Sequence, residues 1–324
     1  MYTFKELQNI IEDNLSKIDL DISPIELYEP IKYTLSAGGK RVRPTLTLAA
    51  CNLFSEDIEK SIKPALALEV FHNFTLLHDD IMDKAELRRN SATVHEKWNE
   101  NIAILSGDAM SIKAYELLSD TEENHLKSVL KIFNKMAIQI CEGQQFDMNF
   151  EEKNDVSEDE YLEMIKLKTS VLLATSLKIG AIVGGANEND AQNLYDFGLN
   201  LGLAFQLQDD FLDVYGDVNT FGKKIGGDII ANKKTFMLIK ALEIADIETK
   251  LKINEILNLK EFDKNFKIKS IVDIYNKLEI SYLAKNKMDY FYKKALNSFD
   301  LVNVEASKKE ILFNFASNLM NRNN

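Results

Sequence analysis

The chain is predicted to be all-α, a single-domain bundle of long antiparallel helices around a central cavity. All four prolines occur by residue 64, and the remainder of the 324-residue chain contains none. Leu, Ile, Lys, Glu and Ala dominate, and alternating β-branched residues are scarce, which is typical of helices. Hydrophobic residues make up 45% of the chain, enough for a sizeable core. No shift in composition divides it, so residues 1–324 are expected to form one domain.

The expected helices follow from apolar periodicity, capping signals and glycine punctuation. The segment 157–160 has the sequence Ser-Glu-Asp-Glu, a capping box that predicts a helix start. Paired glycines at 38–39, 184–185 and 226–227 interrupt the pattern, and the Asn- and Lys-rich stretch 250–269 is expected to be solvated surface. In order, helices are predicted at 4–18, 24–37, 44–54, 61–84, 101–119, 124–150, 157–183, 188–216, 232–258, 268–278 and 281–297, with a last one after 305.

Charge and cysteine content restrict the class of function. The net charge of −12 argues against nucleic-acid binding, because phosphate backbones recruit Lys and Arg, but it allows small anionic substrates. Cys51 and Cys141 form no disulfide framework, which favours a reducing cytoplasm. The N-terminus lacks a signal-peptide pattern, and the apolar run 171–186 is interrupted by Lys178. A soluble protein without stable membrane insertion is expected.

Two copies of the pattern DDxxD, at 79–83 and 209–213, carry the strongest functional signal. Each lies in an apolar, proline-free stretch predicted to be helical. Residues four apart share a helix face, so Asp79 pairs with Asp83 and Asp209 with Asp213. Mg²⁺ usually takes one or two protein carboxylates and completes its shell with water and substrate phosphate. The motifs are therefore predicted to form two walls of one cavity that holds a polyphosphate-bearing substrate.

A single DDxxD is often only a solvated acidic turn. The flanks here are unlike surface, since Phe-Thr-Leu-Leu at 74–77 precedes the first copy and Leu-Ala-Phe-Gln-Leu at 203–207 the second. Acidic residues at the ends of apolar helices are costly to bury unless a cation compensates them. The duplication and the apolar context favour metal binding, with these candidate metal residues: Asp79, Asp80, Asp83, Asp209, Asp210 and Asp213.

Clustered cations accompany both acidic motifs. The segment 38–44, GGKRVRP, joins two predicted helices; its glycines free backbone N–H groups, and Lys40 and Arg43 are suited to clamp phosphate oxygens. Arg88 and Arg89 follow the first motif. The second is followed by FGKKIGGD at 221–228, a glycine-rich, lysine-bearing loop of the kind that binds diphosphate at a helix start, and then by Lys233-Lys234. Any one of these clusters alone would more often be a solvated charge run.

Together these motifs resemble the trans-isoprenyl diphosphate synthases, or polyprenyl synthetases, and among them the short-chain, farnesyl and geranylgeranyl diphosphate synthase-like members. The resemblance runs in order over roughly residues 30 to 240. It is carried by segments 39–44, 76–83 with 88–89, 143–147, 168–169, 205–213 and 221–223. One departure is Asn90, where the family often has Gly, and this leaves the local loop geometry open.

The resemblance implies a role for each matching residue. In the family, three Mg²⁺ ions hold an allylic diphosphate between the two motifs, with direct metal contacts here falling to Asp79, Asp83 and Asp209 and indirect ones to Asp80, Asp210 and Asp213. The allylic diphosphate would be held by Arg88, Lys168, Lys223 and Lys233, with Lys224 able to replace Lys223. Isopentenyl diphosphate would be held by Lys40, Arg43, His72 and Arg89. Thr169 and Gln206 would lie near the reacting carbons, where their oxygen dipoles stabilise an allylic cation.

The implied chemistry fits these residue types. Ionising the allylic C–O bond leaves charge on diphosphate, which Mg²⁺, Lys and Arg stabilise. The carbocation then meets the isopentenyl double bond, and the adduct loses a proton, for which the leaving diphosphate is a suitable base. No Ser, Cys or His nucleophile is needed. The catalytic set would be Asp79, Asp83, Arg88, Lys168, Thr169, Gln206, Asp209 and Lys223. Outside this context His72 would be read as a core histidine.

Product length is expected to depend on residues that precede Asp79 on its helix. One turn rises about 5.4 Å, close to one extended isoprene unit. Phe74 and Thr75 stand five and four residues before Asp79, and Phe71 shares the face of Phe74. Two rings there should stop the growing tail early, and an aromatic at the Phe74 position resembles archaeal-type geranylgeranyl synthases. A C15–C20 product is predicted, with C20 favoured; alternatively, either ring faces a neighbouring helix.

Other functions remain open at the level of sequence. A class I terpene cyclase also ionises an allylic diphosphate, but it would leave the GGKRVRP segment and Arg89 without a role. A longer-chain polyprenyl diphosphate synthase would tend to have small residues where the phenylalanines stand. A non-catalytic subunit of a heteromeric synthase would lack the intact acidic motifs. The predicted small-molecule partners are isopentenyl diphosphate with dimethylallyl, geranyl or farnesyl diphosphate, and the family expectation is a homodimer.

Overall fold

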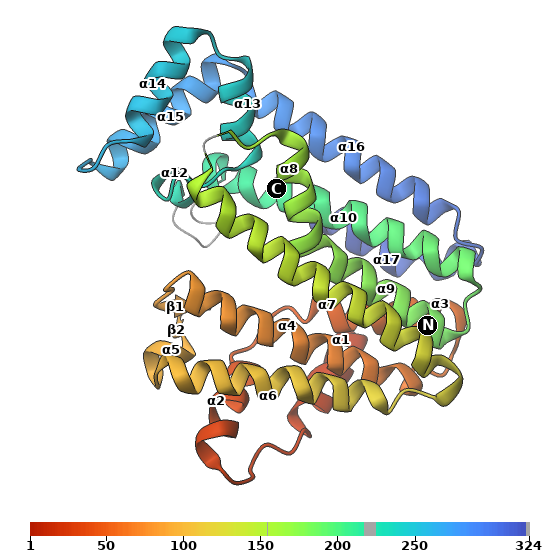
Figure 1. Ribbon diagram of the computed structural model, residues 1–324. Helices are drawn as coiled ribbons and strands as arrows, with labels where there is room; N and C mark the ends of the chain where they lie inside the picture. The colour runs from red at the N-terminus through yellow and green to blue at the C-terminus, as the bar shows by residue number, and fades with distance from the viewer. Residues whose placement is uncertain (154, 217–224, 322–324) are drawn as a thin grey trace. The chain divides into compact units, whose positions relative to one another are not determined.

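The structure is a computed structural model that describes residues 1–153, 155–216 and 225–321 (Figure 1). The elements are, in order, α1 (Phe4–Ser16), α2 (Ile25–Ser36), α3 (Val42–Phe54), η1 (Glu59–Ser61), α4 (Ile62–Met82), β1 (Leu87–Arg88), β2 (Ser91–Ala92), α5 (Val94–Lys97), α6 (Glu100–Ser119), α7 (Glu123–Glu152), α8 (Glu158–Ile165), η2 (Lys166–Ser170), α9 (Val171–Gly184), α10 (Glu188–Tyr215), α12 (Gly227–Ile230), α13 (Phe236–Ile244), α14 (Ile247–Leu257), α15 (Lys264–Lys277), α16 (Ile280–Asp300) and α17 (Ala306–Met320). Apart from one short antiparallel hairpin, the described chain is helical, which confirms the all-α prediction.

Several helix starts are fixed by side-chain caps. Ser157 begins α8 with the predicted capping box, in which its hydroxyl accepts from Glu160 N–H and the Glu160 carboxylate accepts from Ser157 N–H. Thr3 and Glu6 form the same motif at α1. Each box satisfies backbone donors that a helix start leaves without an intrahelical partner.

Two predicted helices are interrupted in the structure. The stretch expected as one helix at 232–258 is two, because Ala245 is extended and the Asp246 side chain caps a new start by accepting from Thr249 N–H. Asp is neutral to poor inside a helix but favourable as the N-cap, the residue just before the first turn, which explains the break. The helix expected at 157–183 contains a π-helical turn at Lys166–Ser170. Side-chain periodicity alone does not predict such a turn.

The described residues fall into two compact units. Unit 1 comprises Met1–Asn134, Thr175–Tyr195 and Val302–Phe313. Unit 2 comprises Lys135–Ala174, Asp196–Leu301 and Asn314–Asn324. The prediction of one domain stays a prediction. The first aspartate motif lies in unit 1 and the second in unit 2.

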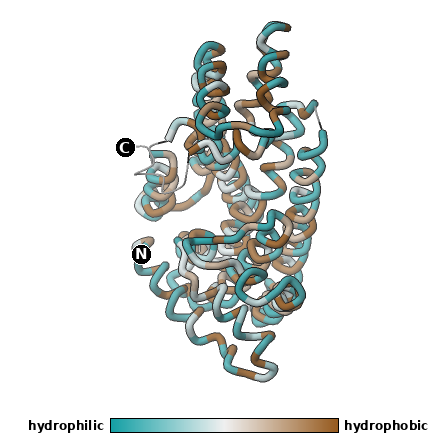
Figure 2. Tube along the Cα trace, turned by 90° about the vertical axis from the view of Figure 1, so that its left-hand side faces the viewer, coloured by the Kyte–Doolittle hydropathy of each residue, from teal (hydrophilic) through white to brown (hydrophobic). Residues whose placement is uncertain are grey.

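Unit 1 is built around α4, which lies side by side with α6 and also packs against α3 (Figure 1). Most of α4 is apolar and buried, whereas its last turn carries the aspartates. Figure 2 shows hydrophobic and hydrophilic residues mixed along most helices, as expected where one face packs and the other meets water. The buried, apolar part of α4 therefore fixes the position of the aspartates in its last turn.

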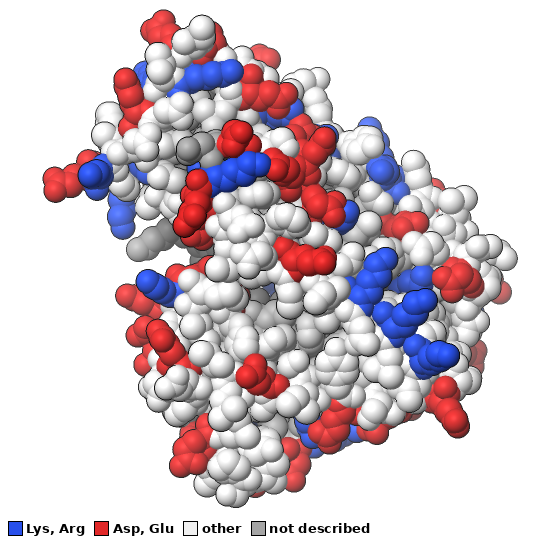
Figure 3. Space-filling model, in the orientation of Figure 1, with Lys and Arg blue, Asp and Glu red and all other residues white. Residues whose placement is uncertain are grey.

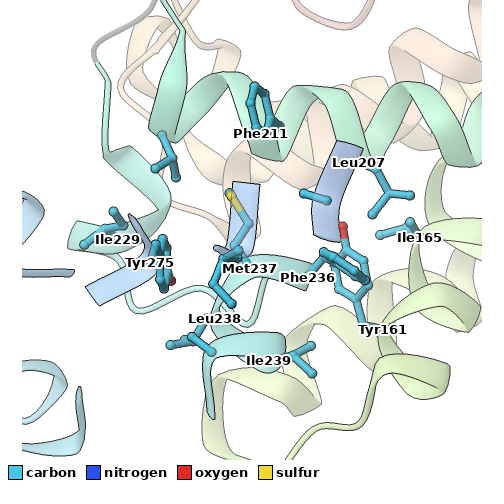
Figure 4. Close-up of a cluster of buried hydrophobic side chains, with 14 of the residues drawn as sticks. Tyr161, Ile165, Leu207, Phe211, Ile229, Phe236, Met237, Leu238, Ile239 and Tyr275 are labelled. Carbon is cyan, nitrogen blue, oxygen red and sulfur yellow. The ribbon is translucent and has the colours of Figure 1, made fainter. Parts of the chain in front are cut away.

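The core of unit 2 is a cluster of buried side chains from α7, α8, α10, α12, α13, α14, α15 and α16 (Figure 4). Phe236 of α13 and Tyr161 of α8 are each 1% exposed, and their ring centroids are 6.5 Å apart. In Figure 4 the Tyr161 hydroxyl points toward α10. A nearly full burial leaves this hydroxyl in need of a protein partner.

One long apolar helix within the described residues, Glu158–Gly184, meets the length and hydropathy criteria for a membrane span. It comprises α8, η2 and α9, and 78% of its most apolar window is buried. It is therefore a core helix rather than a membrane-spanning one.

Candidate active site

The first aspartate motif occupies the last turn of α4. Asp83 is the C-cap, and its N–H donates to the Asp79 carbonyl at 2.9 Å. Asp79 is partly buried and Asp83 exposed. The spacing predicted from sequence is thus present, with both carboxylates at the end of one buried helix.

Asp80, between them, is bound by Arg88. The Arg88 Nε donates to both Asp80 carboxylate oxygens at 2.7 and 2.8 Å, and its Nη2 lies 2.7 Å from Oδ1. The same Nη2 lies 3.6 Å from Asp79 Oδ2. Burial opposes the charged form of Arg88, but Asp80 outweighs it, so the pKa of Arg88 is raised. Asp80 therefore holds Arg88 against the motif.

Arg88 and Arg89 are carried by the β1–β2 hairpin, in which Arg88 pairs with Ser91. The two turn residues, Arg89 and Asn90, have φ of 53° and 62°. A two-residue hairpin turn with positive φ at both positions is the favoured primed type. Asn tolerates this left-handed conformation better than most residues, so Asn90 can stand where the family often has Gly.

A second cationic cluster in unit 1 joins Arg43, His72 and Arg89. The Arg43 Nη1 lies 3.0 Å from His72 Nε2. The Arg43 Nε is buried and has no hydrogen-bond acceptor among the described residues. Burial and the Arg89 charge lower the pKa of Arg43 to about 10, although Glu69 opposes this, and burial with the Arg43 charge holds the pKa of His72 well below its usual value. The neutral His72 thus accepts from Arg43, and the cluster has capacity for an anion.

Arg89 is placed by the glycines of GGKRVRP. Its Nη1 donates to the Gly38 carbonyl. Gly39 has φ of 138°, and a Cβ there would come within 2.9 Å of Arg89 Nη1. Lys40 is exposed, and its carbonyl accepts from Gln8 Nε2 at 3.1 Å. The glycines therefore let the Arg89 guanidinium lie directly on the loop backbone.

Arg41, which sequence reasoning left without a role, is structural. It is 3% exposed and donates to Glu12 at 3.0 Å, to Glu69 at 2.8 Å and to the Leu35 carbonyl at 2.5 Å. All of these partners lie in unit 1. Arg41 thus connects α1, α2 and α4 to the start of α3. Of the two arginines in this segment, only Arg43 has a buried donor without an acceptor among the described residues.

In unit 2, the π-helical turn η2 carries Lys168 and Thr169. It is tightly packed, because a Cβ on Gly143 would lie 2.3 Å from the Lys168 backbone nitrogen, and a Cβ on Gly202 would lie 2.8 Å from Ser170 Cα. The Lys168 Nζ lies 2.6 Å from Asp147 Oδ2. π-Helical turns frequently occur at functional sites, and here α7 and α10 contact this one through glycines.

Thr169 begins a hydrogen-bond chain that reaches the second aspartate motif. Its hydroxyl donates to Gln206 Oε1 at 3.2 Å, Gln206 Nε2 donates to Asp210 Oδ1 at 3.1 Å, and the Tyr161 hydroxyl donates to Asp210 Oδ2 at 2.5 Å. Burial and then the Asp228 carboxylate raise the pKa of Asp210 to about 7. Sequence reasoning missed Tyr161; its place in an amphipathic helix gave no sign of a carboxylate partner.

Asp213 organises the segment that follows. Its carbonyl accepts from Gly226 N–H at 2.6 Å, and its Oδ2 accepts from Asp228 N–H at 3.0 Å. Lys233 is exposed and close enough to Asp210 to pull the pKa of that carboxyl down. Lys223, with Lys224, lies outside the described residues.

The predicted chain-length residues lie in a row of aromatic rings in unit 1. Phe71 and Phe74 have centroids 5.3 Å apart, so they share a face as predicted. Phe71 is 3% exposed and packs on Phe133 of α7 at 5.1 Å, and Phe133 packs on Tyr115 of α6 at 5.1 Å. Phe74 is partly buried and contacts His78 at 4.8 Å. Thr75 donates instead to the His72 carbonyl at 2.8 Å.

The carboxylates fit Mg²⁺ rather than a protein-enclosed metal. Within residues 1–153, 155–216 and 225–321, no group of three His, Cys, Asp or Glu side chains is arranged to hold an ion. Each motif instead offers a pair of carboxylates one turn apart. Mg²⁺ is commonly bound by one or two carboxylates together with substrate phosphates, so the donor set suits an ion that arrives with a diphosphate.

The sequence profile of the family described as polyprenyl synthetase matches residues 24–275. The chain belongs to the polyprenyl synthetase family. This synthetase is accordingly a trans-prenyltransferase, from a family that uses Mg²⁺. It is 39% identical over 314 residues to the geranylgeranyl diphosphate synthase of Sulfolobus acidocaldarius, with 95% of this chain and 93% of that one covered.

Solved structures agree with the fold of this polyprenyl synthetase. A crystal structure of a geranylgeranyl pyrophosphate synthase, 41% identical, covers 100% of both chains with a TM-score of 0.95. The polyprenyl synthase of Caulobacter crescentus CB15, complexed with calcium and isoprenyl diphosphate, is 28% identical and has a TM-score of 0.87, with 99% of this chain and 97% of that chain covered.

Proposed function

We propose that this enzyme condenses isopentenyl diphosphate head-to-tail with an allylic diphosphate to give a short-chain, all-trans product of C15–C20, with C20 favoured. The observation that carries the proposal is that unit 1 has two clusters, an Asp-Arg cluster at the end of α4 and a separate cluster of Arg43, His72 and Arg89. One cluster suits a metal-bound diphosphate and the other a diphosphate bound by cations alone. A single-substrate cyclase needs only the first.

In unit 1, Asp79 and Asp83 would hold Mg²⁺, while Asp80 acts through Arg88. Both Asp80 oxygens already accept from Arg88, which supports an indirect role for that aspartate. Arg88 would then contact the allylic diphosphate from a fixed position. The bidentate geometry matters because planar guanidinium binds oxyanions in a defined orientation.

The isopentenyl diphosphate would be bound by Arg43, His72 and Arg89, with Lys40 at the exposed edge. Support comes from the buried Arg43 Nε without an acceptor and from the neutral His72 that accepts from Arg43. A buried donor without a partner is costly, and a phosphate oxygen would satisfy it. This unused donor favours an anion-binding role for the cluster over a purely structural one.

In unit 2, Asp209 would hold Mg²⁺, with Asp210 and Asp213 acting indirectly. Asp210 accepts from Tyr161 and Gln206, and Asp213 accepts from the start of α12, so both carboxylates already have protein donors. Lys168 and Lys233 would hold the allylic diphosphate, and Thr169 and Gln206 would face the developing cation with their oxygen dipoles. That both motifs hold one diphosphate through three Mg²⁺ ions stays a prediction.

The bound Mg²⁺ would supply positive charge that stabilises the departing diphosphate. The protein's part is to orient the two substrates and exclude water around the cation. The proton lost from the adduct would pass to the leaving diphosphate.

A C20 product is supported by the Phe71–Phe74 pair on α4 and by the names of relatives. Phe74, the more exposed of the two, would form the floor. Some relatives are named geranylfarnesyl diphosphate synthases, so C25 is the neighbouring alternative. A cytoplasmic homodimer is proposed as well. Its support is a set of exposed apolar side chains on α6, where Ile104, Leu105 and Ile112 are 45%, 60% and 69% exposed. Figure 3 shows only scattered charged side chains over this part of the face.

The deciding experiment incubates purified enzyme with Mg²⁺, isopentenyl diphosphate and each of dimethylallyl, geranyl and farnesyl diphosphate, with products sized by mass spectrometry after dephosphorylation. A ladder that ends at C20 is expected. A cyclic hydrocarbon formed from an allylic diphosphate alone, with no elongation, would instead establish a cyclase. Sedimentation of the same preparation gives the oligomeric state, for which a monomer would contradict the dimer.

A further inference from the structure

Lys267 on α15 is a buried cation outside the motifs. It is 1% exposed, and its Nζ donates to Asn232 Oδ1 at 2.6 Å and, more weakly, to the Ile230 carbonyl at 3.4 Å. The Nζ also lies 4.3 Å from the Phe262 ring centroid. No carboxylate pairs with it among the described residues. A buried ammonium without a counter-charge is unfavourable compared with an apolar residue. We therefore expect its hydrogen bonds to have a specific role.

That contact falls on the segment that leads to Lys233. Asn232 has φ of 55°, a left-handed conformation, and its side chain is held from two sides. Its Oδ1 accepts from Lys267, and its Nδ2 donates to the Leu257 carbonyl at the end of α14 at 2.9 Å. The next residue, Lys233, donates its N–H to the Asp228 carbonyl at 2.9 Å. The backbone that presents Lys233 is therefore fixed just before it by α14 and α15.

The other end of the same segment is fixed by the second aspartate motif. Asp213 accepts from Gly226 and Asp228 N–H groups at the start of α12. Ile229 of α12 lies beside Tyr275 of α15 in the core of unit 2 (Figure 4). Residues 226–233 thus form a short segment that is hydrogen-bonded to Asp213 at its start and to Lys267 of α15 near its end.

We propose that Lys267 is a positioning residue for diphosphate binding, which fixes Asn232 and thereby presents Lys233 beside the second aspartate motif. This rests on the proposed role of Lys233 in binding the allylic diphosphate. Lysine suits the position because its long aliphatic chain packs in the core while its ammonium group reaches two acceptors in the segment 226–233. Methionine would fill the same space but donate to neither.

The test compares Lys267→Met, Lys233→Ala and their combination with the unmodified enzyme. Binding of geranyl S-thiolodiphosphate, an unreactive analogue, is measured by calorimetry in the presence of Mg²⁺, and KM is measured for both substrates. Lys267→Met should weaken analogue binding about tenfold, as loss of a supporting contact commonly does. It should raise KM for the allylic substrate but leave KM for isopentenyl diphosphate unchanged, a split that general destabilisation would not give. Lys269→Met, at an exposed lysine of the same helix, is the control.

If Lys267 acts through Lys233, the two changes are not independent. The double variant should then bind the analogue no more weakly than whichever single variant binds it less tightly. Unchanged binding in Lys267→Met, with weakened binding in Lys233→Ala, would overturn the inference and leave the proposed function intact. Unchanged binding in Lys233→Ala would remove Lys233 from the site, and would overturn the inference together with the proposed role of that lysine. The condensation reaction itself is tested separately, by the sizing of its products. If Lys267→Met does not fold, Asn232→Gly takes the same test, since glycine keeps the left-handed backbone but loses both side-chain contacts.

Discussion

The Tyr161 hydroxyl donates to Asp210 with 2.5 Å between the two oxygens, and so ties α8 to the second aspartate motif inside the core of unit 2. Tyr161→Phe keeps the ring and removes this donor. The buried Asp210 then loses one of its two side-chain donors, and we expect the free energy of unfolding to fall by about 1–3 kcal/mol. Denaturant unfolding measures this. Tyr215→Phe, which removes a 3.2 Å bond to Asn276 from a less buried tyrosine, is the control and should change less.

Arg88→Lys should separate charge from geometry at the first motif. Lysine keeps the charge but cannot bind both Asp80 oxygens as the guanidinium does. We expect kcat/KM for the allylic diphosphate to fall about 10- to 100-fold, or about 1.4–2.7 kcal/mol. Arg89→Lys, on the next residue, should raise KM for isopentenyl diphosphate instead. The same substrate dependence in both variants would contradict separate binding sites.

Phe74→Ala should lengthen the product by one isoprene unit or more, because it removes the partly buried ring of the proposed floor. Phe71→Ala should mainly destabilise the fold, by about 3–5 kcal/mol, because Phe71 is 3% exposed and packs on Phe133. Product sizing and thermal unfolding distinguish the two effects. An unchanged product in a folded Phe74→Ala enzyme would show that the floor lies elsewhere.

Stability should depend on pH through His72. Burial and the Arg43 charge hold the pKa of His72 in the folded protein well below the ordinary value near 6.5. Below pH ~6.5, His72 therefore binds a proton in the unfolded chain but stays neutral in the folded one. The contribution of neutral His72 is therefore complete above pH ~6.5 and declines as the pH falls below it. His72→Gln keeps an acceptor for Arg43 and should lose less stability between pH 7.5 and 5.5 (about one unit either side of 6.5). Urea midpoints at the two pH values measure this, with His125→Gln, near the start of α7, as the control; an equal decline in His72→Gln would contradict it.

Asn90→Gly tests the left-handed hairpin turn. Asn90 has φ of 62°, and glycine adopts this conformation without steric cost. We expect activity to be retained and the free energy of unfolding to change by no more than about 1 kcal/mol, in either direction, because glycine also gains entropy when unfolded. Asn90→Val, with a β-branched side chain, should be clearly destabilising and should also impair Arg88 and Arg89. A tolerated valine would contradict a constrained turn.

The sequence alone predicted the all-α class, most helices, the capping box at Ser157 and the two carboxylate pairs. These are local properties: periodicity, caps and four-residue spacing are set by a few neighbouring residues. The family followed from motifs that occur in order along the chain. Misplaced boundaries, such as the break at Asp246, came where a cap signal competed with continuous apolar periodicity.

Only the tertiary structure assigned partners to individual polar groups. Arg41 and Arg43 are two residues apart and look alike in sequence, yet one is fully paired with Glu12, Glu69 and Leu35 while the other keeps a buried Nε without an acceptor. Tyr161 and Lys267 appear in sequence as ordinary members of amphipathic helices. Each becomes informative only because it is buried and hydrogen-bonded to a residue distant in sequence, Tyr161 to Asp210 and Lys267 to Asn232. A buried donor must find an acceptor wherever the fold provides one, and that choice is made by packing across many residues rather than by local sequence.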